Sequence, residues 1–170
     1  AGMGLFVLFS RILPLNGPVI VWCALTFIVT FALEAVGVAT GAIFGSYHYG
    51  AVLGPGVLGV PPIIGLNWLV VIVGANELCR TFFRRKLPVV LAAAFACTLF
   101  DLVLEPVAVA FGYWTWTGGG VPLQNYVAWF LIALTASAGY SLLDTGGERR
   151  IAARHVVFQF CFFLFSTHRK

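Results

Sequence analysis

Long apolar segments separated by short polar connections make up most of this chain of 170 residues. An α-helix rises about 1.5 Å per residue, so about 20 apolar residues cross the hydrocarbon core of a bilayer. The alternating segments of about ten residues that mark a membrane β-barrel do not occur. The pattern therefore predicts an all-α, polytopic membrane helical bundle of about five spans, which forms one domain over residues 1–170. The predicted spans are residues 18–44, 60–79, 87–111, 125–143 and 151–166.

The start of the chain is apolar but too short for a full span. Residues 3–15 follow Ala1 and Gly2. We interpret them either as the tail of a truncated, partial sixth span or as an interfacial segment, and the start of the chain as processed, tagged or incomplete.

Composition and the placement of charge also indicate a membrane protein. Charged residues make up 9% of the chain, whereas a soluble domain carries about 25%. Basic loops follow the second and fourth predicted spans, while residues 45–59 and 112–124 contain no Lys or Arg. By the positive-inside rule the basic loops face the cytoplasm and the other two face outward. We expect an integral protein of a prokaryotic cytoplasmic membrane with membrane lipid as a partner. The net charge of +4 comes from the basic loops, and we expect no nucleic-acid partner.

Three acidic residues interrupt the apolar spans. Asp101 and Glu105 lie one helical turn apart in the third span, and a charge at membrane depth costs about 3 kcal/mol. Their mutual repulsion favours a proton on one of them. Glu34 continues a polar stripe of Thr26 and Thr30 on the first span. Acids at this depth usually serve a function, so we take all three as candidate catalytic residues.

The depth of these residues predicts that they meet. The first and third spans run outward, so Glu34, Asp101 and Glu105 fall in the outward half of the bilayer. The second span returns inward and brings Asn67 and Trp68 to a compatible level. Polar groups from three helices at one level predict a single site.

Aromatic and amide side chains gather in the two outward loops and at the start of the fourth span. Tyr and Trp here are typical of the interfacial aromatic belt, but they also suit the rim of a pocket for a flat conjugated ligand or a carbocation. The candidate substrate-binding residues in these segments are Tyr47, Tyr49, Trp114, Trp116, Gln124 and Asn125.

Several common catalytic motifs are missing from the sequence. The three histidines show no metal-ligand spacing, and there is no phosphate-binding loop, dinucleotide fingerprint or nucleophile elbow. We therefore expect no metal and no cofactor. Two other features predict packing only: the glycines at 37, 41 and 45 allow another helix to approach, and Glu77 beside Arg80 forms a surface ion pair.

Taken together, the motifs resemble those of the carotenoid biosynthesis membrane family, which includes carotenoid 1,2-hydratases. The matching motifs, within about residues 30–135, are Glu34-x2-Gly37-x2-Thr40-Gly41-x2-Phe44-Gly45-x-Tyr47-x-Tyr49, Gly59-Val60-Pro61 with Asn67-Trp68, Asp101-x3-Glu105-Pro106, Gly112-Tyr113-Trp114-x-Trp116 and Gly120-Val121-Pro122-Leu123-x-Asn125-x3-Trp129-Phe130. Two features depart from the family pattern. Members are typically longer, and Glu105 stands where the family usually has Asp before Pro106.

The resemblance implies an enzyme that adds water across the terminal 1,2 double bond of an acyclic carotenoid end. In that reaction Asp101 or Glu105 donates the proton, and Glu34, with Asn67 or Gln124, positions and deprotonates the water. The intermediate cation is stabilised by the indole rings of Trp68, Trp114 or Trp116.

Three other functions stay open at the level of the sequence. The same loop resembles that of the small membrane lycopene cyclases, which have acidic residues where this chain has Gln124 and Asn125, so hydration is favoured over cyclisation. A non-catalytic carotenoid-binding subunit is a further alternative, and a transporter or proton channel is a weaker one.

Overall fold

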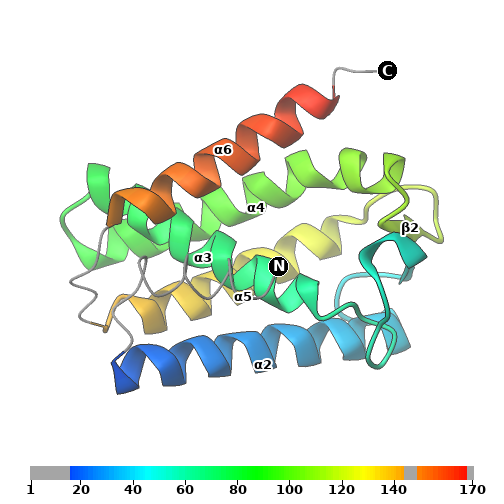
Figure 1. Ribbon diagram of the computed structural model, residues 1–170, viewed down its shortest axis with the longest axis horizontal. Helices are drawn as coiled ribbons and strands as arrows, with labels where there is room; N and C mark the ends of the chain where they lie inside the picture. The colour runs from blue at the N-terminus through cyan, green and yellow to red at the C-terminus, as the bar shows by residue number, and fades with distance from the viewer. Residues whose placement is uncertain (1–15, 144–148, 168–170) are drawn as a thin grey trace.

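Five α-helices and a two-stranded ribbon make up the described part of the chain (Figure 1). The structure is a computed structural model that describes residues 16–143 and 149–167. The elements are α2 (Gly17–Thr40), β1 (Tyr47–Tyr49), the short 3₁₀ turn η1 (Ala51–Leu53), α3 (Ile63–Phe82), α4 (Lys86–Ala110), β2 (Trp114–Trp116), α5 (Leu123–Tyr140) and α6 (Arg149–Thr167). This confirms the predicted all-α helical bundle, with helix ends within a few residues of the predicted spans.

Three of these helices are long and apolar enough to cross a membrane, namely α2, α3 and α4. A shorter apolar stretch, Ala152–Ser166, lies within α6. Membrane crossing by α5 and α6 stays a prediction. The proposed partial sixth span falls in residues 3–15, outside the described residues.

Helix α2, at one edge of the bundle in Figure 1, has its polar residues inside and many of its apolar residues outside. Thr26, Thr30 and Glu34 are buried, whereas Leu25 and Ile28 are more than half exposed. The Thr30 hydroxyl donates to the Thr26 carbonyl at 2.9 Å, so the helix backbone satisfies it. This inverted pattern is expected where lipid surrounds the protein and polar groups face the bundle interior.

Helix α3 lies at the centre of the bundle and packs against α2, α4, α5 and α6. Most of its length is buried, including Trp68, Val71 and Ile72. Because every other helix touches α3, a side chain on its inner turns can reach residues from all parts of the chain.

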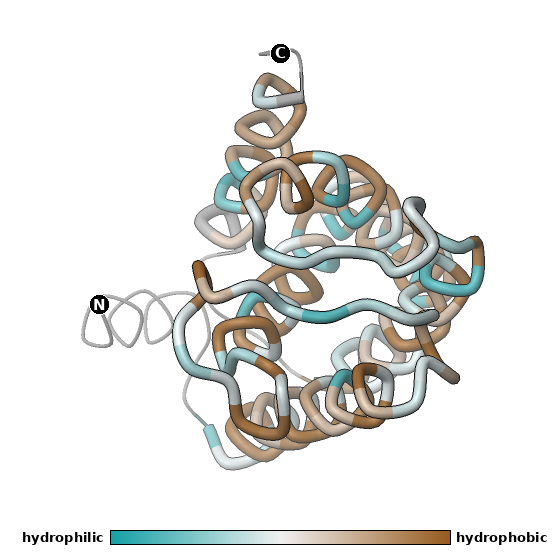
Figure 2. The backbone as a smooth tube through the Cα atoms, turned by 90° about the vertical axis from the view of Figure 1, so that its right-hand side faces the viewer, coloured by the Kyte–Doolittle hydropathy of each residue, from teal (hydrophilic) through white to brown (hydrophobic). Residues whose placement is uncertain are grey.

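The two loops predicted to face outward meet at one end of the bundle. Residues of β1 and β2 pair antiparallel, with Tyr47 opposite Trp116 and Tyr49 opposite Trp114. Figure 2 shows these segments crossing the bundle end in front of the mainly apolar helices. The ribbon covers the end of the bundle at which α2 and α4 finish and α3 and α5 begin.

The glycine run does not mediate helix–helix packing, so that prediction was wrong. Helix α2 ends at Thr40, because Gly41 adopts the left-handed conformation (φ 68°) and caps the helix. Gly37 instead makes room for an aromatic ring: a Cβ there would lie 2.5 Å from Cδ2 of Phe44. The chain therefore folds back onto α2 directly after the helix.

At the opposite end of the bundle, Glu77 and Arg80 do form an ion pair, at 2.9 Å, but it is not a surface pair as predicted. Glu77 is only 2% exposed, and the Tyr140 hydroxyl donates to its Oε1 at 2.8 Å. The Arg80 guanidinium lies over the Tyr140 ring, and Asn76 donates to Ser137 at 2.8 Å. These contacts connect α3 to α5.

Candidate active site

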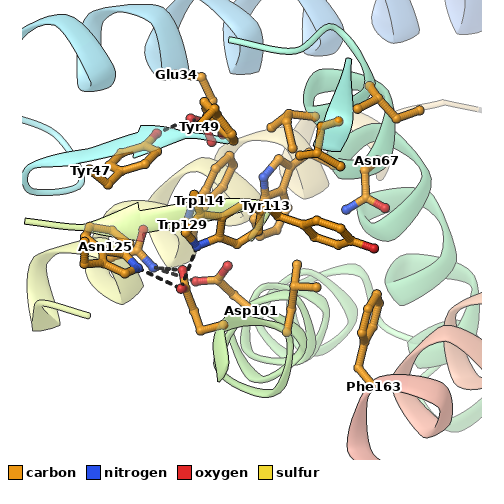
Figure 3. Close-up of a pocket in the computed structure, with 17 residues that line it drawn as sticks. Glu34, Tyr47, Tyr49, Asn67, Asp101, Tyr113, Trp114, Asn125, Trp129 and Phe163 are labelled. Carbon is orange, nitrogen blue, oxygen red and sulfur yellow. Dashed lines mark hydrogen bonds between the residues drawn. The ribbon is translucent and has the colours of Figure 1, made fainter. Parts of the chain in front are cut away.

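A cavity of about 140 Å³ lies beneath the ribbon, at the end of the bundle where the acidic residues meet (Figure 3). Residues from all five helices and both strands line it. They are Glu34, Tyr47, Tyr49, Leu53, Ile63, Ile64, Asn67, Trp68, Asp101, Leu104, Glu105, Tyr113, Trp114, Trp116, Asn125, Trp129 and Phe163. Every sequence-predicted site residue except Gln124 is in this set.

The ribbon register explains how four aromatic residues reach the cavity. Successive side chains of a strand point to opposite faces, so Tyr47 and Tyr49 share one face of β1. Trp114 and Trp116 lie opposite them on β2 and share that face. The ribbon thus presents two phenols and two indoles to the helices below.

The two phenols bind Glu34 of α2. Both the Tyr47 and the Tyr49 hydroxyl donate to Glu34 Oε2, the latter at 2.8 Å. Burial raises the pKa of Tyr47 and of Tyr49 above the ordinary tyrosine value. Both phenols therefore keep their protons at neutral pH and can donate to the carboxyl group.

The two indoles bind Glu105 of α4 in the same way. The Nε1–H groups of Trp114 and Trp116 both donate to Glu105 Oε2, each at 2.9 Å. An indole N–H can only donate, so this oxygen serves as a double acceptor. Such bonds to a carboxylate contribute about 1.5–3 kcal/mol each. The ribbon therefore fixes the Glu105 carboxyl group in one orientation.

Asp101 has a different set of partners. The Asn125 amide donates to Asp101 Oδ2 at 2.7 Å and to Glu105 Oε1 at the long distance of 3.5 Å. No hydrogen bond from a described residue reaches Asp101 Oδ1, although the residue is only 2% exposed and lines the cavity. One oxygen of Asp101 is therefore available to a molecule in the cavity.

Stacked aromatic rings form the wall of the cavity. The Trp68 and Trp129 rings are parallel within 17°, with centroids 3.5 Å apart. Phe44 also stacks on Trp129, with centroids 5.0 Å apart. Electron-rich ring faces attract a positive charge, so this wall suits a cationic or polyunsaturated ligand.

One predicted substrate-binding residue lies outside the cavity. Gln124 is exposed, and its amide donates to the Ala42 carbonyl, which connects α5 to the loop after α2. Asn67 and Tyr49 do line the cavity but are only partly buried.

Sequence reasoning missed several lining residues. Trp129 follows Asn125 by four positions and so lies on the same helix face, a signal that could have identified it. Tyr113 directly precedes the predicted indoles. No sequence signal points to Phe163, because none of the motifs that predict the site falls on α6.

Within residues 16–143 and 149–167, no group of three or more His, Cys, Asp and Glu residues is arranged to hold a metal ion. The three cavity carboxyl groups instead take hydrogen bonds from phenol, indole and amide donors.

Comparison with known proteins gives a family and a relative. A model of the carotenoid biosynthesis protein family matches residues 3–167. The chain is 34% identical over 133 residues to the bisanhydrobacterioruberin hydratase of Haloarcula japonica. That alignment covers 71% of this chain but only 43% of the relative, so the chain spans less than half the length of that protein. No solved structure matches the chain.

Proposed function

Because the chain belongs to the carotenoid biosynthesis protein family, we propose that it adds water across the terminal 1,2 double bond of an acyclic carotenoid end. The observation that carries this proposal is the convergence of Glu34, Asp101 and Glu105 on one aromatic-walled cavity. The resemblance to a relative named as a hydratase supports hydration, and the apolar helices support a site within a membrane, which we assign to a prokaryotic cytoplasmic membrane.

The cavity volume suits the end of the substrate. An apolar protein cavity of about 150 Å³ holds benzene, and this cavity measures about 140 Å³. It therefore admits roughly one isoprenoid unit and excludes the remainder of a long polyene. The reaction is accordingly confined to the chain end.

Protonation of the alkene is the difficult step, and we assign it to Asp101. Oδ2 of Asp101 accepts from Asn125, which leaves Oδ1 to carry a proton into the cavity. Glu105 is less suitable as the donor, because the two indole N–H groups on its Oε2 favour the charged carboxylate over the protonated acid. The alkene π electrons form the new C–H bond at C2, and Asp101 becomes a carboxylate.

The positive charge then resides on C1, a tertiary carbon. The stacked Trp68 and Trp129 rings stabilise this charge, since a cation over an aromatic face gains about 0.5–2 kcal/mol. The fixed Glu105 carboxyl group adds electrostatic stabilisation without reorganisation.

Water completes the reaction by forming a C–O bond at C1. Glu34 takes the proton that the water loses, since its Oε2 is held by two phenols and its Oε1 has no donor among the described residues. Transfer of that proton back to Asp101 through water restores both groups. Asp101 donates the one proton that the alkene gains, and Glu34 accepts the one proton that the water loses. No step therefore requires a cofactor.

Expression in a host that accumulates lycopene, followed by mass analysis of the pigments, tests this function. We expect products heavier by one or two waters, and loss of these products with Asp101→Asn. A product of unchanged mass but altered retention would indicate end-group cyclisation. Unchanged pigment with the protein present in the membrane would indicate a carotenoid-binding subunit. Either of these results contradicts the hydratase proposal.

A further inference from the structure

The residues that line the cavity differ in how far they are exposed at the protein surface. Glu34, Asp101 and Glu105 are at most 3% exposed. Ile63, at the start of α3, is 44% exposed although it lines the same cavity. The other partly exposed lining residues are Leu53, Asn67, Tyr113 and Phe163, together with Tyr49 of the ribbon.

We call Ile63, Leu53, Asn67, Tyr113 and Phe163 the mouth of the cavity. Figure 3 shows Asn67, Tyr113 and Phe163 across the cavity from Tyr47 and Asn125. Helices α3 and α6 pack side by side, and the mouth lies between the first turns of α3 and the last turns of α6. The cavity therefore opens sideways from the bundle.

The surface around the mouth is apolar. Phe162 and Phe165 of α6 are 51% and 71% exposed. Phe163 itself is held in place by an edge-on contact with buried Phe100, at 5.7 Å between ring centroids. Leu53, Ile63 and Phe163 offer no hydrogen bonds, so most of the rim suits a hydrocarbon, while Asn67 and Tyr113 add one amide and one phenol to it.

We propose that the mouth is the site that binds the substrate chain adjacent to the reacting end, so that the polyene extends between α3 and α6 into the lipid. This proposal rests on the proposed function, which places only the end group in the cavity. A linear polyene must leave a cavity of about 140 Å³ through an opening. The mouth is mainly apolar, and its residues line the same cavity as the buried acids.

Substitutions that narrow the mouth provide the test, with the full chain purified in lipid nanodiscs. Ile63→Phe and Phe163→Trp enlarge rim side chains. Val52→Phe and Phe158→Trp are matched controls, because both positions are exposed and neither lines the cavity. Each protein is assayed with lycopene and with a branched five-carbon alkene that reproduces the end group alone.

We expect Ile63→Phe and Phe163→Trp to lower the rate with lycopene about tenfold, and the rate with the short alkene by less than about twofold. The controls should leave both rates unchanged. Wild-type rates with lycopene in the narrowed variants would overturn the proposal. So would equal losses with both substrates, since the residues would then act on the cavity interior.

A binding measurement separates this proposal from the proposed function. If the wild-type protein hydrates neither substrate, the proposed function fails, and quenching of tryptophan fluorescence by lycopene then reports binding alone. About tenfold weaker binding by Ile63→Phe than by Val52→Phe would support the mouth independently of catalysis. Equal affinity of these two variants would overturn it.

Discussion

Asp101 and Glu105 are one helical turn apart, yet their hydrogen bonds give them different chemistry. Glu105 accepts two indole N–H groups on one oxygen. Asp101 accepts one amide and leaves an oxygen free toward the cavity. The two acids are thus distinguished by their donors, which are the indoles of β2 for Glu105 and the Asn125 amide of α5 for Asp101.

This difference predicts unequal effects of the two amide substitutions. Asp101→Asn removes the transferable proton, and we expect hydration to fall by about 10²–10⁴-fold. In Glu105→Gln the amide oxygen can still accept both indoles, so we expect a partial loss, of about tenfold. Pigment mass analysis, normalised to protein in the membrane, measures both. A larger loss in Glu105→Gln than in Asp101→Asn would reverse the assignment.

The ribbon tyrosines predict a pH effect on stability. Burial raises the pKa of Tyr47 and Tyr49, whereas an unfolded tyrosine titrates near pH 10. Their contribution to stability is therefore complete below about pH 10, and it is lost as the pH rises beyond that value because only the unfolded chain ionises readily. The unfolding temperature should fall more steeply above about pH 10 in wild type than in Tyr47→Phe/Tyr49→Phe.

Tyr113→Phe is the control for this effect, because no described residue bonds the Tyr113 hydroxyl. It should retain the wild-type slope. If the unfolding temperature fell as steeply above about pH 10 in the double variant as in wild type, the two tyrosines would not be the cause of that fall. At neutral pH the double variant should itself be less stable by about 1–3 kcal/mol per lost hydrogen bond, since Glu34 stays buried.

At the scale of elements, the sequence predicted where helices lie better than how they end. The positions of the helices were predicted from the lengths of the apolar segments alone. The end of α2 did not, because a glycine every fourth residue also fits a helix–helix contact, and only the fold reveals that Gly41 caps the helix while Phe44 packs on Gly37. The pairing of β1 with β2 was not predicted from the sequence either, because each strand contains three residues and the helices α3 and α4 separate them in the chain.

The fold-back at Gly37 leads to a prediction about the aromatic wall. Gly37→Ala places a Cβ 2.5 Å from Cδ2 of Phe44, so the Phe44 ring must shift, and with it the stacking of that ring on Trp129. We expect a loss of about 1–3 kcal/mol of stability and a change in the near-ultraviolet circular dichroism of the tryptophans. Gly118→Ala is the control, because a Cβ there meets nothing within 4 Å. Equal stability of the two variants would contradict the tight packing.

Two groups of hydrogen-bonded polar residues lie at opposite ends of the described bundle. The cavity carboxyls were predictable as one site because depth along the spans brings them to one level. The second group was not predictable, since Glu77 and Arg80 are three residues apart and read as a surface pair, whereas Tyr140 comes from a helix 60 residues further along the chain. Phe163 was missed for a similar reason: its role depends only on how α6 lies against α4.

The separation of the two groups predicts that stability and activity can be changed independently. Asn76 is fully buried and donates to Ser137 at 2.8 Å, so Asn76→Ala leaves a buried hydroxyl without its donor and should cost about 1–3 kcal/mol. The rate of hydration per folded molecule should stay unchanged, because neither residue lines the cavity. Ser137→Ala, combined with Asn76→Ala in a double-mutant cycle, should show coupling of about 0.5–3 kcal/mol. If Asn76→Ala instead lowered activity per folded molecule as strongly as Asp101→Asn, the polar group at the far end would belong to the proton path, and the assignment of all proton transfers to the cavity carboxyls would be wrong.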